Sequence, residues 1–196
     1  MPIYTIIGGV NGAGKSSLTG VLKSERSDLG SVIDVDKIAA ENNCGNLEAG
    51  KIAVAKINGF LQKGVSFTQE TTLSGHRTEV TVRKALGQGY TVRLFYVGLN
   101  AVQESVKRIK NRVEKGGHDI PDDDVERRFE TRFESLAAIL PYCHEVHFYD
   151  NENGFAEVAE YRNGELLPIG NYRPKWLSDL ADALARSTEQ VEDLER

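Results

Sequence analysis

The sequence predicts an α/β fold, with a mostly parallel sheet and helices on both of its faces. Two observations support this prediction. Apolar stretches of strand length alternate with helical patterns along the chain, and such alternation implies β-α-β crossovers. A glycine-rich loop also separates the first expected strand from the first expected helix. The 196 residues fit a single domain, residues 1–196, which is long enough to bury a sizeable core.

Five stretches rich in β-branched and aromatic residues predict strands, at residues 3–7, 31–34, 65–70, 90–99 and 146–149. The fourth stretch is apolar almost throughout, so we expect it near the centre of the sheet. Apolar residues at helical spacing predict the intervening helices, at residues 15–25, 47–63, 77–86, 101–115 and 122–140. Glycines follow several of these helices, as is typical of helix C-termini.

The rhythm changes after the fifth strand. Asn163 and Gly164 lie between two short apolar stretches, which predicts a β-hairpin over about residues 155–168. We expect this C-terminal hairpin at the edge of the sheet. A last helix is expected from about residue 175 to residue 185, with the glutamate-rich end as a frayed tail.

The glycine-rich loop runs from Gly9 to Ser16 and matches the phosphate-binding pattern G-x-x-x-x-G-K-[ST]. Its glycines let the backbone curl so that several N–H groups face one anion, and the following helix adds a favourable dipole. Lys15 would reach the β- and γ-phosphates, and the Ser16 hydroxyl would ligate Mg²⁺. ATP and Mg²⁺ are the expected cofactors. The candidate nucleotide-binding residues are Gly9, Asn11, Gly12, Ala13, Gly14, Lys15, Ser16 and Ser17.

The loop refines the fold prediction to a three-layer P-loop NTPase or kinase fold. In such sheets ligands bind outside the carboxyl ends of the strands, where carboxylates hold Mg²⁺ or accept the proton of a substrate hydroxyl. Asp36 and Glu70 follow two strands and are the main candidates. Asp34 has a second interpretation as a helix cap, and Asp150 is more simply a structural acid. No aspartate ends the fourth strand, so the metal would depend on Ser16 and Glu70.

Three hydroxyl residues, Thr71, Thr72 and Ser74, follow Glu70. They can hydrogen-bond a polar substrate or cap the helix that starts near Arg77, and the sequence favours neither. With Asp36 and Glu70, Thr72 completes the candidate substrate-binding set.

An arginine-rich helix–loop–helix lies between the fourth and fifth strands and predicts a lid over about residues 108–132. Arginine suits phosphate oxygens, and lid closure keeps water from the transferring phosphoryl group. We expect Arg112 and Arg128 to contact phosphate, whereas Arg108, Arg127 and Arg132 more often pair with nearby glutamates on the surface. His118, in the loop of the lid, is expected to hydrogen-bond rather than to act as a base.

Composition and sequence patterns argue against several other classes of protein. The formal net charge of −5 argues against a nucleic-acid binder. Cys44 and Cys143 match no zinc-binding spacing. No signal peptide and no apolar stretch of membrane-spanning length is found, so the expected location is the cytoplasm, without membrane association.

Together, these motifs resemble the zeta toxin family, and in particular its short, single-domain branch. The resemblance covers roughly residues 3 to 150. It is carried by the phosphate loop, by the segments that contain Asp36 and Glu70, by the block from Arg112 to His118 and by the Arg127-Arg128-Phe129 segment.

The resemblance implies phosphorylation of a UDP-N-acetylsugar, such as UDP-N-acetylglucosamine, at the 3′-hydroxyl of the amino sugar by ATP. Asp36 falls at the family's catalytic base, and Glu70 and Thr72 fall in its substrate and metal turn. Arg112, with Arg127 or Arg128, matches the two phosphate-binding arginines, and we favour Arg128. The long C-terminal elaboration of larger zeta toxins is absent, and the segment between Asp36 and Glu70 is compact.

The sequence therefore predicts a phosphotransferase with an alcohol acceptor. Its expected partners are a small molecule, for which the resemblance implies a nucleotide sugar, and an antitoxin protein. Two alternatives stay open: a kinase for another metabolite, and an ATPase or nucleotide-dependent switch. The chain supplies its own lid arginines and a candidate base, and both favour a kinase over a switch.

Overall fold

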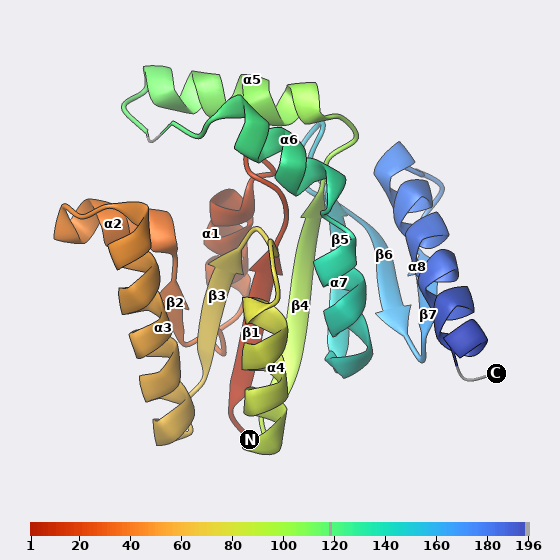
Figure 1. Ribbon diagram of the computed structural model, residues 1–196, viewed down its shortest axis with the longest axis horizontal. Coiled ribbons are helices and arrows are strands. Elements are labelled where there is room, and N and C mark those ends of the chain that lie inside the picture. Colours follow the sequence, from red (N-terminus) through yellow and green to blue (C-terminus); the bar gives the residue numbers. More distant parts are fainter. Residues whose placement is uncertain (118, 195–196) are drawn as a thin grey trace.

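The computed structural model describes residues 1–117 and 119–194. Its strands form one seven-stranded sheet in the order β2-β3-β1-β4-β5-β6-β7 (Figure 1). The first five strands are parallel, and the last two are antiparallel additions at one edge. The strands are β1 (Ile3–Gly8), β2 (Ser31–Ile33), β3 (Phe67–Thr71), β4 (Thr91–Gly98), β5 (Glu145–Asp150), β6 (Ala156–Arg162) and β7 (Glu165–Pro168).

Helices cover both faces of the sheet and its carboxyl end. They are α1 (Lys15–Glu25), α2 (Val35–Asn42), α3 (Asn46–Lys63), α4 (Arg77–Gly87), α5 (Val102–Glu114), α6 (Asp122–Glu130), α7 (Glu134–Ile139) and α8 (Lys175–Leu194), with a short 3-10 helix at Leu140–Tyr142. Helices α3, α4 and α7 lie in front of the sheet in Figure 1, α1 lies behind it, and α5 and α6 cross its upper end.

Two hydrophobic clusters hold these layers together. On the front face, apolar residues of α3, α4, α7 and α8 pack against strand residues such as Tyr4, Phe67 and Phe148. On the back face, Leu18 and Leu22 of α1 pack against the strands. The core is thus divided by a sheet that is apolar on both faces, as a parallel sheet between helical layers requires. The predicted P-loop kinase fold, with its mostly parallel sheet, lid and edge hairpin, is confirmed.

The lid region differs from its prediction in one respect. A single helix was expected over residues 122–140, but the chain turns at residues 131–133 and forms α6 and α7. The residues on the two sides of this turn belong to different hydrophobic clusters. Phe129 packs with the back-face residues, whereas Phe133 and Leu136 pack with the front-face residues. One straight helix could not present both groups to opposite faces of the sheet.

Helix α2 and the length of helix α8 also differ from the sequence prediction. Helix α2 was missed because its eight residues are too few for a clear hydrophobic period. Helix α8 continues to Leu194, although a frayed tail was predicted beyond residue 185. The start of α8 is anchored by Trp176, which is fully buried and donates a hydrogen bond from Nε1 to Asp150 Oδ1 at 2.8 Å.

The close approach of α8 to the sheet depends on Gly98. A Cβ atom at this position would lie 2.2 Å from atoms of the Trp176 ring. We therefore expect Gly98→Ala to lower the free energy of unfolding by about 1–3 kcal/mol through overpacking, measured by urea denaturation. Gly20→Ala is the matched control. Apart from the chain neighbours and the backbone of α1 itself, no described atom lies within 4 Å of a Cβ there. In a helix this change should raise stability by about 0.5–1 kcal/mol. Equal effects of the two substitutions would contradict this packing.

Candidate functional site

The phosphate loop connects β1 to α1 at the carboxyl end of the sheet. Three of its glycines have positive φ angles, of 144° at Gly9, 74° at Gly12 and 103° at Gly14. Space is also restricted: a Cβ at Gly9 would lie 2.5 Å from the carbonyl oxygen of Val97. These positions require glycine for both conformation and contact, and they give the loop the curled course that an anion site needs.

The Lys15 side chain folds back over this loop. Its Nζ donates hydrogen bonds to the carbonyl oxygens of Gly9 at 2.9 Å and Val10 at 3.1 Å. Burial lowers the pKa of Lys15 to about 8, although the negative charges of Glu70, Asp36 and Asp34 act in the opposite direction. The ammonium group is thus positioned at the loop but only partly stabilised in its charged form.

Glu70, near the end of β3, is the centre of a hydrogen-bond group with α1. Ser16 Oγ donates to its Oε2 at 2.7 Å, and Thr19 Oγ1 donates to its Oε1 at 2.6 Å. Only 8% of Glu70 is exposed. Both oxygens of a nearly buried carboxylate are therefore directed at the first turn after the phosphate loop, where the predicted metal ligands Ser16 and Glu70 meet.

The two aspartates after β2 have different surroundings. Asp34 is the N-cap of α2, and its Oδ1 accepts hydrogen bonds from the backbone N–H groups of Asp36 and Lys37. Its interpretation as a cap is therefore correct. Asp36 instead extends its carboxylate from the first turn of α2, and Oδ2 lies 3.5 Å from the Arg112 guanidinium. About half of this side chain is exposed.

The lid arginines approach the phosphate loop from α5 and α6. Arg128 NH1 donates to Asn11 Oδ1 at 3.0 Å. Arg108, expected on the surface, donates to the carbonyl oxygens of Gly12 at 3.4 Å and Asn151 at 2.6 Å. Two guanidinium groups thus contact the phosphate loop, and that of Arg112 lies beside Asp36.

The remaining lid arginines point elsewhere. Arg127 pairs with Asp124 and is about two-thirds exposed, so the structure places Arg128, not Arg127, against the loop. Arg132 stacks over the rings of Phe129 and Phe133 at 4.0 and 4.3 Å and has a structural position. His118 lies outside the described residues.

Three polar residues of this site were missed in the sequence. Thr19 could have been found, because it lies three residues after Ser16 on the same face of a helix. Asn151 also had a signal, since it directly follows β5, and its Nδ2 donates to the Ala13 carbonyl oxygen at 2.9 Å. Ser105 donates from Oγ to the Asn11 carbonyl oxygen and had no detectable signal in the sequence.

The turn after β3 opens onto a cleft. The Thr72 and Ser74 hydroxyl oxygens lie 2.9 Å apart, and the residue before α4 is His76, whose side chain makes no capping bond within the described structure. Neither hydroxyl caps the helix. A cleft of about 430 Å³ lies between this turn and helices α6 and α7, within the volume range of ligand pockets. Most of its lining residues are polar, and they include Ser74, His76, Glu79, Arg127 and Arg128.

Comparison with solved structures places the chain among P-loop kinase folds. A chain of the AvrRxo1-ORF1:AvrRxo1-ORF2 complex with ATP superposes with a TM-score of 0.65 at 15% identity, covering 94% of this chain. This chain spans 63% of the length of that one. A chain of the PezAT chromosomal toxin–antitoxin system of Streptococcus pneumoniae gives 0.61 at 15% identity, covering 95% of this chain and 85% of that one. The resemblance to the zeta toxin family is confirmed for the fold.

Sequence comparison identifies a closer relative. No family model matches the sequence. An uncharacterised protein of Haemophilus influenzae is 36% identical over 127 residues, which cover 62% of this chain and 88% of that protein. The chain belongs to the same family as this Haemophilus protein.

Among the described residues, no helix is both long and apolar enough to cross a lipid bilayer.

The different surroundings of Asp34 and Asp36 predict different effects on stability. Asp34→Ala should lower the free energy of unfolding by about 1 kcal/mol, because it removes the cap of α2. Asp36→Ala should cost less, because its exposed ion pair with Arg112 contributes little. Urea denaturation of both variants measures this difference. A larger loss for Asp36→Ala would mean that Asp36 has a structural function.

Proposed function

We propose that the protein is an ATP-dependent kinase that phosphorylates a hydroxyl group of a small molecule. The observation that carries this proposal is the contact between Arg112 and Asp36, at 3.5 Å. It joins a lid arginine to an exposed carboxylate beside the phosphate loop. A phosphoryl transferase needs a cation for the transferring group and a base for the acceptor hydroxyl at one place.

The phosphate loop supplies the nucleotide side. Its positive-φ glycines and the start of α1 favour an anion, and Lys15 would exchange the carbonyl oxygens of Gly9 and Val10 for the β- and γ-phosphate oxygens. Arg128 and Arg108 already contact the loop and would turn their donors toward the phosphates. The complex of a similarly folded chain with ATP supports this assignment.

The residues present fit a Mg²⁺ ion. Magnesium prefers oxygen ligands, and the Ser16 hydroxyl and the Glu70 carboxylate lie together at the start of α1. When bound, Mg²⁺ would neutralise charge on the phosphates during transfer. Glu70 also holds the hydroxyls of Ser16 and Thr19 in a fixed orientation.

Asp36 would supply the acceptor side. Its carboxylate is exposed, and the N-cap of α2 is supplied by Asp34 instead. In the proposed reaction it orients the acceptor hydroxyl and accepts its proton, while the hydroxyl oxygen attacks the γ-phosphorus and ADP leaves. Arg112 and Arg128 would balance the charge of the transferring group, and the lid would exclude water.

The cleft beside the β3–α4 turn supports a proposal for the class of acceptor. Arg128 lines this cleft and also contacts Asn11 of the phosphate loop, so it connects the two spaces. A polar lining with arginines suits an acceptor that carries hydroxyl and phosphate groups. A nucleotide sugar such as UDP-N-acetylglucosamine has both, and Thr72 would be among its hydrogen-bonding groups.

An antitoxin is a further proposed partner. The similar structures come from a toxin–antitoxin system and from a two-component complex, which supports a protein partner for this chain.

The kinase proposal is tested by incubating the protein with ATP, Mg²⁺ and UDP-N-acetylglucosamine and measuring a phosphorylated sugar nucleotide by mass spectrometry. Asp36→Asn should reduce kcat by about 10²- to 10⁴-fold, because it removes the proposed base, and should leave ATP affinity nearly unchanged. Asp34→Asn is the matched control and should retain activity. Absence of product, with no effect of Asp36→Asn on any ATP-dependent activity, would contradict the proposal.

The position of Lys15 predicts a pH dependence of nucleotide binding. Phosphate favours the charged ammonium, whereas burial in the free protein lowers the pKa of Lys15 to about 8. ATP affinity should therefore be constant just below this pH. It should fall by about tenfold per pH unit above it, because binding then requires uptake of a proton. Calorimetric titration measures the profile. In Lys15→Arg the decline should disappear, since arginine stays charged, and a decline that persists would assign it to another group.

A further inference from the structure

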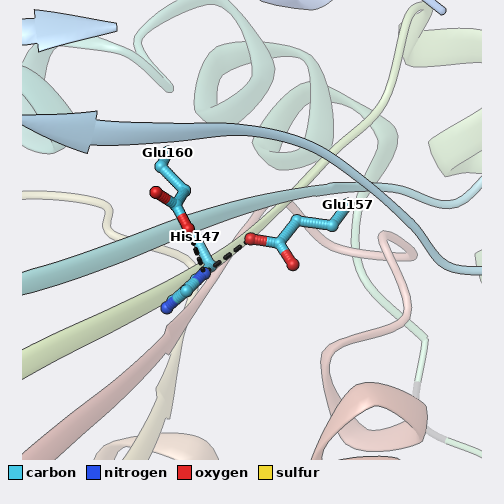
Figure 2. Close-up of side chains that lie close together, drawn as sticks. All are labelled: His147, Glu157 and Glu160. Atoms are coloured by element: carbon cyan, nitrogen blue, oxygen red, sulfur yellow. Dashed lines mark hydrogen bonds and ion pairs between the residues drawn. The ribbon is translucent and has the colours of Figure 1, made fainter. Parts of the chain in front are cut away.

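A group of ionisable side chains lies on the back face of the sheet, away from the phosphate loop. His147 of β5 pairs across the sheet with Glu160 of β6, and Glu157 lies opposite Tyr149. Residues three apart in a regular strand point to opposite faces, but the register between β5 and β6 shifts between Phe148 and Tyr149. This bulge leaves one extra residue in β6, so Glu157 and Glu160 both face His147 (Figure 2).

The carboxylates of Glu157 and Glu160 both approach the Nδ1 atom of His147. His147 Nδ1 lies 2.6 Å from Glu157 Oε1 and 3.9 Å from Glu160 Oε1. One ligand atom from each residue lies within 4.8 Å of the other two. Ligand atoms that share a zinc ion lie about 3–3.5 Å apart, so movements of under about 1 Å by the two carboxylates would fit them around a metal.

The other ring nitrogen is held in the way that metal-binding histidines are held. His147 Nε2 lies 3.0 Å from Glu145 Oε1, so an N–H at Nε2 can donate to this carboxylate and leave the lone pair of Nδ1 for a ligand. Glu145 is itself fixed by the buried Arg93, at 2.8 Å, and by Arg26, at 3.2 Å.

Packing restricts the ring further and leaves the site accessible. The His147 ring stacks on Phe95 with centroids 5.2 Å apart and planes inclined by 14°. An open cleft of about 780 Å³, lined in part by His147, Glu145 and Glu160, gives an ion a path to the site.

We propose that His147, Glu157 and Glu160 form a binding site for a divalent transition metal of the zinc class. One imidazole nitrogen and two carboxylates are a ligand set that such ions accept, whereas Mg²⁺ and Ca²⁺ prefer oxygen alone. The ion would bind side chains of both β5 and β6 and so link the two strands. Strand pairing in the sheet changes from parallel to antiparallel at this point. This site is separate from the Ser16–Glu70 position of the proposed kinase centre.

A proton and a metal ion would compete for the same atom, Nδ1 of His147. Without a metal, an N–H at Nδ1 can donate to Glu157 Oε1 across the same 2.6 Å. The two states differ in their response to added metal, so they can be separated by experiment.

The test is calorimetric titration of the nucleotide-free full-length protein with Zn²⁺ alone, together with thermal unfolding. We expect one zinc ion per chain and a higher Tm with zinc. His147→Ala and Glu160→Gln should abolish both effects. Glu145→Gln, which alters only the positioning residue, should weaken binding by about 10- to 100-fold. Circular dichroism of the metal-free variants shows whether they are folded. Glu157→Gln is a second conservative ligand variant, with the same expected loss of zinc binding as Glu160→Gln.

Two matched controls identify the site. Glu70→Gln removes the candidate carboxylate at the phosphate loop, and His76→Asn removes an exposed histidine. Both variants should bind zinc as the unaltered protein does. The proposal is overturned if the unaltered protein binds no zinc, if His147→Ala binds it unchanged, or if Glu70→Gln or His76→Asn abolishes binding. None of these results depends on kinase activity, so the two proposals fail separately.

Discussion

The hydrogen bonds from Ser16 and Thr19 to Glu70 connect the two elements on which the site depends. Glu70 lies near the end of β3, and its partners lie on the first turns of α1, beyond the phosphate loop. A nearly buried carboxylate is costly unless its oxygens are satisfied, and here each accepts from a hydroxyl at 2.6–2.7 Å. The same contact fixes the orientation of the Ser16 hydroxyl, so folding and the proposed metal site share one interaction.

The sheet makes this contact possible. β1 lies between β3 and β4, and its last residue, Gly8, is in register with Thr71 on one side and Tyr96 on the other. The phosphate loop therefore leaves the sheet between two strand ends. The segment after β4 leads to α5 and α6, which return arginines over the loop (Figure 1). Residues far apart in the sequence, such as Asp36 and Arg112, meet because parallel strands gather their carboxyl ends at one edge.

Much of this arrangement could be predicted from local patterns. Strand–helix alternation predicted the parallel sheet, Asn163-Gly164 predicted the edge hairpin, and the glycine pattern predicted the phosphate loop. The patterns were least informative where tertiary contacts decide the structure. The break between α6 and α7 follows from two clusters on opposite faces, and the position of Arg108 against Gly12 depends on how α5 crosses the sheet. The bulge that gathers Glu157 and Glu160 has no local signal, because strand period alone puts these residues on opposite faces.

The central claim is that the phosphate loop has an acceptor side, formed by Asp36 and the lid, and that the protein therefore transfers phosphate to an organic hydroxyl. Incubation with γ-³²P-labelled ATP, Mg²⁺ and a pool of small metabolites tests it most directly, with the label separated into organic and inorganic phosphate. We predict labelled organic product that disappears in Asp36→Asn and in Arg128→Ala. Label that appears only as inorganic phosphate, or that stays in ATP with every metabolite, would contradict the claim and indicate an ATPase or a nucleotide-dependent switch.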